Sequence, residues 1–249
     1  MVLSLTRWVG KVALVTGANA GIGAAITKQL METGIKVVGL DKTLDSMETI
    51  IAEKQNQSQL LHPLKCDMSK EEDILNAFEW VDRNLGPVSI LINNAGVILD
   101  TNIVEGDTKL WKETLDINVL GTCIATRETV KRMRQNDIDG HIFNINSVGG
   151  HRAPYFSFSN VYPASKHAVT ALTETTLKEL DSLGLRIKIT SISPGLVKTN
   201  MTIEMSHLPA VESEDVADAV MYGLSTPPYV QINELMITPV NEKYVEEVN

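Results

Sequence analysis

The sequence predicts an α/β fold: a single-domain, Rossmann-like, doubly wound parallel sheet of about seven strands with helices on both faces. Three observations lead to this prediction. Short runs rich in β-branched residues alternate with longer helical segments. Most of these runs are apolar nearly throughout, as expected for parallel strands that helices cover on both sides. A glycine-rich turn directly follows the first run and opens the first helical segment.

The expected strands are the short apolar runs. They are Val12–Thr16, Lys36–Leu40, Leu60–Cys66, Ser89–Asn93, His141–Asn146, Ile187–Ser193 and Ile232–Ile237. The segments between them are long enough for the crossover helices that join parallel strands. Examples are Gly21–Thr33, Ser69–Leu85, Thr108–Arg134 and Val161–Leu183. The polar stretch Glu53–Gln59 is interpreted as a helix end plus a loop. Because no linker or fixed-period repeat interrupts the pattern, we expect residues 1–249 to form one domain.

Composition excludes several classes of function. Of the 249 residues, 43% are hydrophobic and 21% are charged, which is ordinary for a globular protein. The net charge of −9 and the lack of a basic cluster argue against nucleic acid or an anionic membrane as a partner. The sequence has no signal-peptide layout and no apolar run of roughly 18 residues, so we expect a cytoplasmic protein. Its two cysteines and five histidines show no spacing typical of a metal site.

The turn after the first strand has the residues of a dinucleotide site. It contains Gly17, Asn19, Gly21, Ile22 and Gly23. Glycine lets the backbone turn tightly and approach a pyrophosphate, whose charge is stabilised by the N-terminus of the following helix. A glycine turn that only connects two elements is the alternative interpretation. The position of this turn, directly after the first strand, favours nucleotide binding over that alternative.

A carboxylate and an ammonium follow the second strand. Asp41 lies 20 residues after Gly21, where a carboxylate accepts hydrogen bonds from the adenosine ribose hydroxyls. The same charge repels the extra phosphate of NADP. Lys42 is either a partner for that 2′-phosphate or a solvated loop charge, and we favour the second interpretation. We therefore expect NAD as the favoured cofactor, with NADP possible. After the third strand, Asp67 either contacts the adenine or caps a helix that begins near Ser69.

A phenol and an ammonium four residues apart suggest the chemistry. Tyr162 and Lys166 would lie on one face of a helix, about one turn apart. A neighbouring ammonium stabilises a phenolate and lowers its pKa from about 10 toward the range of an acid–base catalyst. The hydroxyl of Ser147 precedes Tyr162 by 15 residues. The spacing alone also fits a solvated helix face. With the glycine turn, it favours an oxidoreductase.

Together with Asn93–Gly96, whose sequence is Asn-Asn-Ala-Gly, these motifs resemble the short-chain dehydrogenase/reductase family. The resemblance extends from Lys11 to about Pro239. Gly150-His151-Arg152 and the spacing between Ser147 and Tyr162 are similar to a subgroup of insect farnesol dehydrogenase-like and vertebrate dehydrogenase/reductase member-eleven-like proteins. Members of this subgroup usually carry Ala-Arg where this chain has Asp41-Lys42, and they prefer NADP. Because Asp41 and Lys42 replace that Ala-Arg pair, the resemblance does not carry the subgroup's preference for NADP over to this chain.

The resemblance implies roles for further residues. Asn118, Ser147, Tyr162 and Lys166 would form a catalytic tetrad, in which Asn118 holds a backbone kink and a water that relays protons to the lysine. Asn94 and Gly96 would shape the cofactor groove, and Lys166 would bind the nicotinamide ribose. The residues flanking the nicotinamide amide would be Pro194, Gly195, Val197 and Thr199. The helices Thr108–Arg134 and Val161–Leu183 would pair subunits in a homodimer or homotetramer.

We therefore expect reversible oxidation of an apolar alcohol to an aldehyde or ketone. The expected substrate loops, residues 151–160 and 199–212, carry apolar side chains, namely Tyr155, Phe156, Phe158, Met201 and Met205. The resemblance favours farnesol or a similar terpenoid. An NADP-dependent carbonyl or hydroxysteroid reductase and a catalytically silent dinucleotide sensor are the alternatives. For His151 we favour a loop hydrogen bond over a role as catalytic base.

Overall fold

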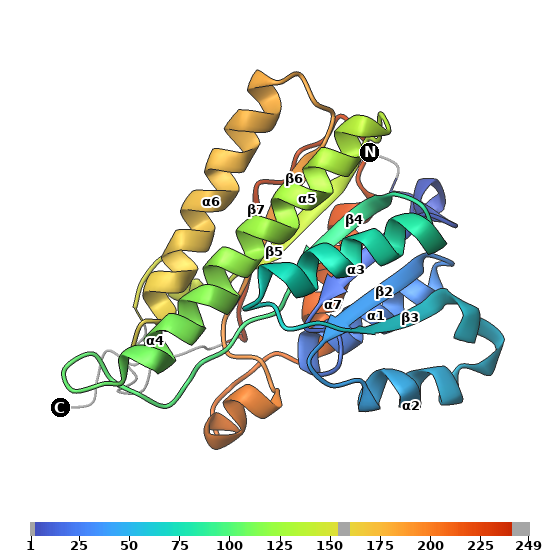
Figure 1. Cartoon of the computed structure of the whole chain (residues 1–249). Helices are drawn as coiled ribbons and strands as arrows, with labels where there is room; N and C mark the ends of the chain where they lie inside the picture. The colour runs from blue at the N-terminus through green and yellow to red at the C-terminus, as the bar shows by residue number, and fades with distance from the viewer. Residues whose placement is uncertain (1–2, 154–159, 241–249) are drawn as a thin grey trace.

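The apolar runs of the sequence form one parallel sheet of seven strands in the order β3-β2-β1-β4-β5-β6-β7 (Figure 1). The computed structural model of the chain describes residues 3–153 and 160–240. The strands are β1 Val12–Thr16, β2 Lys36–Asp41, β3 Leu61–Lys65, β4 Val88–Asn93, β5 His141–Ile145, β6 Lys188–Pro194 and β7 Glu234–Ile237. All six neighbouring pairs are parallel. The predicted doubly wound fold is confirmed.

Helices cover both faces of this sheet. Their bounds are α1 Gly21–Glu32, α2 Asp45–Glu53, α3 Glu71–Asn84, α4 Thr108–Leu115, α5 Thr122–Gln135, α6 Tyr162–Ser182 and α7 Ser213–Ser225. One core joins the sheet to α1, α2 and α7, for example through Ile26, Met47 and Val220. The other joins it to α3, α5 and α6, for example through Phe78 and Leu180. The inner strands are therefore buried on both sides, which explains why most of them are apolar nearly throughout.

Two helices were not among the predicted segments. The helix α2 ends at Glu53, which agrees with the predicted helix end, but the expected loop beyond it contains the 3₁₀ helix η2, Gln55–Leu60. The helix α7 begins with a capping box, in which Glu212 and Asp215 each accept a backbone N–H of the other. That motif is visible in the sequence as an acidic pair three residues apart, and it marks a helix start.

The position of β1 creates the crevice in which a ligand site is expected. The chain runs from β1 outward to β2 and β3, then returns to β4 on the other side of β1. In open α/β sheets, ligands bind where the strand order reverses, at the carboxyl ends of the strands. The turns after β1, β2 and β4 all meet at this edge. None of the helices in residues 3–153 and 160–240 combines the length and apolar character needed to cross a membrane.

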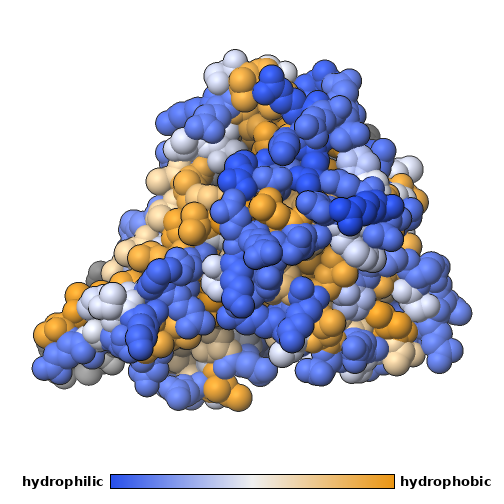
Figure 2. All heavy atoms as spheres, in the orientation of Figure 1, coloured by the Kyte–Doolittle hydropathy of each residue, from blue (hydrophilic) through white to orange (hydrophobic). Residues whose placement is uncertain are grey.

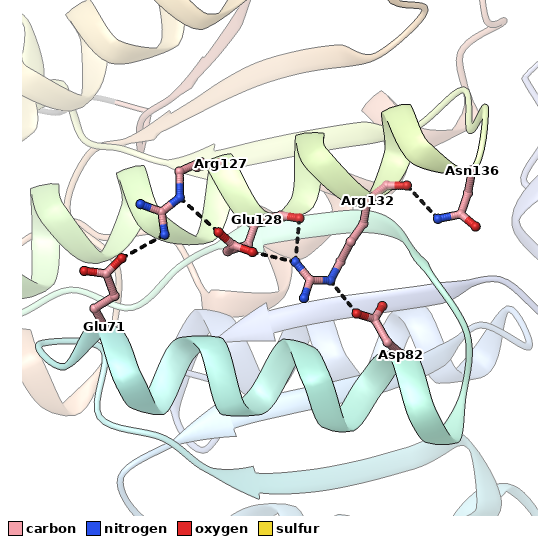
Figure 3. Close-up of polar contacts among 6 residues, drawn as sticks. All are labelled: Glu71, Asp82, Arg127, Glu128, Arg132 and Asn136. Carbon is pink, nitrogen blue, oxygen red and sulfur yellow. Dashed lines mark hydrogen bonds and ion pairs between the residues drawn. The ribbon is translucent and has the colours of Figure 1, made fainter.

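A chain of ion pairs fastens α3 to α5 on one face of the sheet (Figure 3). Glu128 on α5 is only 6% exposed and accepts hydrogen bonds from Arg127 at 3.0 Å and from Arg132 at 2.7 Å. These arginines also bind Glu71 and Asp82 of α3, at 2.8 Å and 2.7 Å. Burial alone would raise the pKa of the Glu128 carboxyl, but the hydrogen bonds and charges of the two arginines outweigh it and lower the pKa. The buried carboxylate thus stays ionised and paired.

We expect Glu128→Gln to lower the free energy of unfolding by about 2 kcal/mol, because it leaves the largely buried Arg132 with only Asp82 as a charged partner. The control Glu71→Gln removes an exposed partner and should change stability by less than about 0.5 kcal/mol. Folding lowers the pKa of Glu128, so the carboxylate adds to the free energy of unfolding above about pH 4.3. This stabilisation is lost as the pH falls through the pKa of Glu128 in the folded state. Urea unfolding at neutral and acidic pH measures both effects. Equal losses in the two variants would contradict this account.

Candidate active site

The turn between β1 and α1 is packed too tightly for any residue but glycine at two positions. Gly17 has a φ of +66°, in the left-handed region. A Cβ at Gly23 would lie 2.0 Å from the carbonyl oxygen of Gly17, so helix and turn touch backbone to backbone. Ala20 precedes α1 and provides no side-chain cap, so the first N–H groups of the helix are available to an anion. This cradle fits the pyrophosphate of a dinucleotide.

Asn94, directly after β4, fixes the floor of the groove. Its side-chain Nδ2 donates to the carbonyl oxygens of Thr16 and Gly17, at 2.9 Å and 3.0 Å. In return, the backbone N–H groups of Asn94 and Ala95 donate to the Thr16 hydroxyl, at 3.0 Å and 2.9 Å. The carboxyl ends of β1 and β4 are thereby locked together beside the glycine turn.

Asp41, the last residue of β2, lies against the glycine turn. One carboxylate oxygen accepts the backbone N–H of Asn19 at 3.1 Å, and the other accepts that of Thr43 at 3.2 Å. Each oxygen keeps a free lone pair that can accept a ribose hydroxyl. The Asn19 side chain is used within the protein: Oδ1 accepts the N–H groups of Ser46 and Met47 at the start of α2. Direct contact of that side chain with the cofactor remains a prediction.

Lys42 is not the free solvated charge that we favoured from the sequence. Its Nζ lies 3.4 Å from Asp67 Oδ1 and 3.6 Å from Oε1 of Glu113, a residue of α4. Nothing in the sequence marked Glu113, because the ion pair joins segments far apart in the chain. Lys70 Nζ lies 4.0 Å from Asp67 Oδ2, so the three carboxylates of Asp41, Asp67 and Glu113 and two ammonium groups lie at this end of the groove.

The predicted helix cap at Asp67 lies one turn too early. Its Oδ1 accepts both the N–H and the hydroxyl of Ser69, at 3.0 Å and 2.7 Å, but α3 begins only at Glu71. Asp67 thus closes the turn before the helix. Burial would raise the pKa of its carboxyl, but the hydrogen bonds from Ser69 and the charge of Lys42 lower it instead. The predicted adenine contact remains a prediction.

Tyr162, Lys166 and Ser147 come together at the same edge of the sheet. Tyr162 begins α6, and Lys166 Nζ lies 5.7 Å from the centre of its ring, one helical turn later. The Ser147 hydroxyl forms a hydrogen bond with the phenol. Ser147 Oγ also accepts the N–H of Gly149 at 3.0 Å, which caps the short helix η4, Val148–Gly150. The hydroxyl is thus held between the phenol and a helix start.

Asn118 lies in the middle of a π turn, η3, Asp116–Gly121, between α4 and α5. A π turn therefore interrupts the long helix that the sequence predicts. The amide is 2% exposed, so the side chain faces the protein interior and not the solvent. Asn118 Oδ1 accepts the N–H of Val97 at 2.9 Å, and Nδ2 donates to the Val97 carbonyl at 3.1 Å and to Ser165 Oγ at 3.0 Å. Gly96 lies beside it, since a Cβ there would be 3.5 Å from Asn118 Oδ1 and 3.8 Å from Lys166 Nζ.

Burial controls the protonation of Tyr162 and Lys166. It raises the pKa of Tyr162 to about 12, against a smaller lowering by the hydrogen bond with Ser147. It lowers the pKa of Lys166 to about 8. Burial thus opposes the lowering of the phenol pKa that we expected from the neighbouring ammonium. The Lys166 Nζ itself donates to the carbonyl oxygen of Ile145 at 2.8 Å.

The segment expected at the nicotinamide leaves β6 and crosses the glycine turn. Pro194 ends β6, and the N–H of Gly195 donates to Ile237 O at 2.8 Å. Val197 is buried and forms a single bridge to Val211. Thr199 caps η5, Asn200–Met205, and its Cγ2 lies 3.0 Å from where a Cβ at Gly21 would be. Ile22, the next residue of α1, packs against the core below.

The substrate loops are only partly described. Tyr155, Phe156 and Phe158 lie outside the described residues. His151 Nε2 lies 2.7 Å from Oε1 of Glu234 on β7, so the loop hydrogen bond that we favoured is confirmed. Met201 is exposed, whereas Met205 is buried. Within the described part of the chain, no group of three or more His, Cys, Asp or Glu side chains is arranged to hold a metal ion.

Comparisons with known proteins agree with this geometry. The model of a family described as short chain dehydrogenase matches residues 11–209. Farnesol dehydrogenase of Aedes aegypti is 48% identical over 96% of this chain and 100% of its own length. Dehydrogenase/reductase SDR family member 11 of Bos taurus is 42% identical over 96% of this chain and 99% of its own length. The closed form of a serine dehydrogenase complexed with NADP+ has a TM-score of 0.84 at 27% identity, covering 96% of this chain and 98% of that one.

The Lys166 ammonium should leave a signature in the pH dependence of stability. Because folding lowers its pKa to about 8, from about 10.4 in an unfolded chain, stability should rise with pH between these values. Lys166→Met removes this titrating group, so the free energy of unfolding should rise less steeply with pH. Part of the rise should remain, because burial also lowers the pKa of Lys188 to about 8. Lys178→Met, at an exposed position of the same helix, is the control. Urea unfolding across this pH range measures the slopes, and identical slopes for the three proteins would count against the buried ammonium.

Proposed function

We propose, since the chain belongs to the short-chain dehydrogenase family of NAD(P)-dependent oxidoreductases, that it interconverts an apolar alcohol and the corresponding aldehyde or ketone. The observation that supports this most directly is the convergence of Ser147, Tyr162 and Lys166 beside the glycine turn. These groups can bind a carbinol oxygen and move its proton next to a dinucleotide site.

In the proposed mechanism, the Tyr162 phenol first loses its own proton by way of Lys166. The phenolate then takes the hydroxyl proton of the alcohol, and Ser147 donates a hydrogen bond to the same oxygen as negative charge develops there. The bound dinucleotide would supply the hydride acceptor, C4 of its nicotinamide. Lys166 would pass the phenol proton onward, because its own proton is held weakly enough, with a pKa of about 8, to exchange near neutral pH. General acid–base transfer contributes roughly 10²–10⁴-fold to the rate, so orientation of the two carbons must supply much of the rest.

Exposed apolar side chains at the carboxyl edge support an apolar substrate. Ile103 and Val104 lie on the loop after β4, and Met201 and Ile203 lie on η5; each is at least 48% exposed. Single exposed apolar residues are common, but pairs on two loops at the ligand-binding edge provide adaptable surface for a hydrocarbon chain. The similarity to farnesol dehydrogenase of Aedes aegypti supports a terpenoid alcohol such as farnesol.

For the cofactor we propose NAD rather than NADP. The carboxylate of Asp41 lies against the glycine turn, where it would accept the ribose hydroxyls, and Asp67 and Glu113 would add negative charge at the same end of the groove. A 2′-phosphate carries about −1.5 to −2 charges and would be repelled there. The NADP+ complex of the similar serine dehydrogenase and the position of Lys42 favour the second candidate, an NADP-dependent carbonyl reductase.

We also propose that the protein assembles through α5 and α6 as a homodimer or homotetramer. A groove of about 680 Å³ runs between these helices, lined in part by Val130, Leu172 and Leu183. Figure 2 shows apolar side chains gathered over α6, beside the more hydrophilic surface of α5 and α3. A second copy would cover this apolar surface.

Tyr162→Phe tests the proposed chemistry. We expect it to reduce turnover at least about 10²-fold, because the phenyl ring cannot accept the proton. Dinucleotide affinity should change little, since the ring shape is kept. Turnover is followed through the absorbance of the reduced nicotinamide with both cofactors and a panel of farnesol, geraniol, retinol and hydroxysteroids. Tyr222→Phe, an exposed tyrosine of α7, is the control. Undiminished turnover in Tyr162→Phe would rule out Tyr162 as the group that accepts the proton. A wild-type protein that binds a dinucleotide but turns over none of these alcohols would favour the alternative of a catalytically silent dinucleotide sensor.

Asp41→Ala tests the cofactor preference. Removing the carboxylate should lower the ratio of kcat/KM for NAD to that for NADP by about tenfold, since a hydrogen bond to a charged group is worth about 1.5–3 kcal/mol. Glu48→Ala, on the exposed side of α2, is the control for a general change of charge. An unchanged ratio in Asp41→Ala would remove the basis for proposing NAD.

A further inference from the structure

We propose that Glu113 is a specificity-determining residue, which holds the ammonium of Lys42 across the adenosine end of the groove and so keeps it from serving as an anchor for the 2′-phosphate of NADP. The inference rests on the proposed dinucleotide function and adds to it a residue that contacts neither the reacting atoms nor the glycine turn.

The two side chains reach each other from opposite sides of β1. Lys42 follows β2, which pairs with one edge of β1, whereas Glu113 lies on α4, which follows β4 on the other edge. Their 3.6 Å ion pair therefore spans the groove between the two halves of the sheet. Lys42 is next to Asp41 in the chain, so its ammonium is the cation closest in sequence to the ribose position.

The two carboxylates that hold Lys42 differ in their other bonds. Asp67 is fixed by two hydrogen bonds from Ser69, so its charge stays in place with or without Lys42. For Glu113, Lys42 is the one ion-pair partner found among residues 3–153 and 160–240. Asp67, at 3.4 Å, still holds the Lys42 ammonium when Glu113 is removed, so a Glu113 variant releases the ammonium from the α4 side of the groove only.

The helix that presents Glu113 is held in place by the catalytic region. Asp107 caps the start of α4 by accepting the N–H of Lys109 at 2.8 Å. At the other end, the π turn is held by the bonds of Asn118 to Val97. Glu113 is one turn and a residue before Asn118, so its backbone position is set by the same contacts that set the tetrad. Because α4 is held at both ends, the carboxylate of Glu113 can hold the flexible Lys42 side chain toward α4.

Two effects of Glu113 on NADP must be separated. Its charge could repel the 2′-phosphate directly, or it could act by withdrawing Lys42 from the phosphate. Only the second effect requires the lysine. A double-mutant cycle of Glu113→Gln and Lys42→Gln distinguishes them. Both side chains are about half exposed, so the effect of the single ion pair is expected to be about threefold rather than a hundredfold.

The experiment measures dissociation constants for NAD+ and NADP+ by isothermal titration calorimetry on the whole chain, which needs no substrate or turnover. Glu113→Gln should tighten NADP+ about threefold and leave NAD+ unchanged. In the Lys42→Gln background, Glu113→Gln should have no effect on either cofactor. Glu113→Asp should restore much of the wild-type discrimination. Glu105→Gln, an exposed carboxylate on the loop before α4, controls for net charge.

Three outcomes would overturn the inference. One is an unchanged NADP+ affinity in Glu113→Gln, and another is the same gain in Glu105→Gln. The third is the same gain with and without Lys42, which would indicate direct repulsion. In each of these cases the wild type still binds NAD+, so the proposed function stands. A wild type that binds neither dinucleotide would refute the proposed function and this inference together.

Discussion

The buried amide of Asn118 connects the parts of the site. With one oxygen and one nitrogen it satisfies both backbone groups of Val97 after β4 and reaches the hydroxyl of Ser165 on α6. Asn118 lies within the π turn, and its side chain is 2% exposed. The loop after β4, the α4–α5 helix and the helix that carries Tyr162 and Lys166 are thereby tied at one point. Buried polar groups must be paired, so the three elements cannot separate without leaving this amide unsatisfied.

Much of the fold could be predicted because its strands are buried on both faces. Runs such as Val88–Asn93 are apolar nearly throughout, and in a chain where they alternate with helical segments this pattern is typical of parallel strands covered on both sides. The glycine turn could also be interpreted in advance, since Gly23 occupies a position where a side chain would overlap the backbone of Gly17. Such constraints act between residues close together in the chain, so the sequence alone reveals them. By contrast, α7 was missed, although its capping box is a local signal of the same kind.

Contacts between distant segments could not be predicted. The pairing of Lys42 with Glu113 depends on how α4 approaches β2, which no local pattern specifies. The protonation of Tyr162 is a second example. Four-residue spacing places an ammonium near a phenol, but whether the ammonium faces the phenol or the Ile145 carbonyl depends on the neighbouring strand. In the folded chain, burial has the largest effect on both groups. It raises the pKa of Tyr162 and lowers the pKa of Lys166.

Asp41 has a consequence for how such proteins diverge. Its carboxylate accepts two backbone N–H groups, one from the glycine turn and one from the loop into α2, whose start is in turn held by Asn19. A lineage that exchanges this residue for a neutral one therefore loses two backbone hydrogen bonds together with the charge. Each lost bond costs stability, so such an exchange is tolerated best where a nearby substitution restores the support of the two loops.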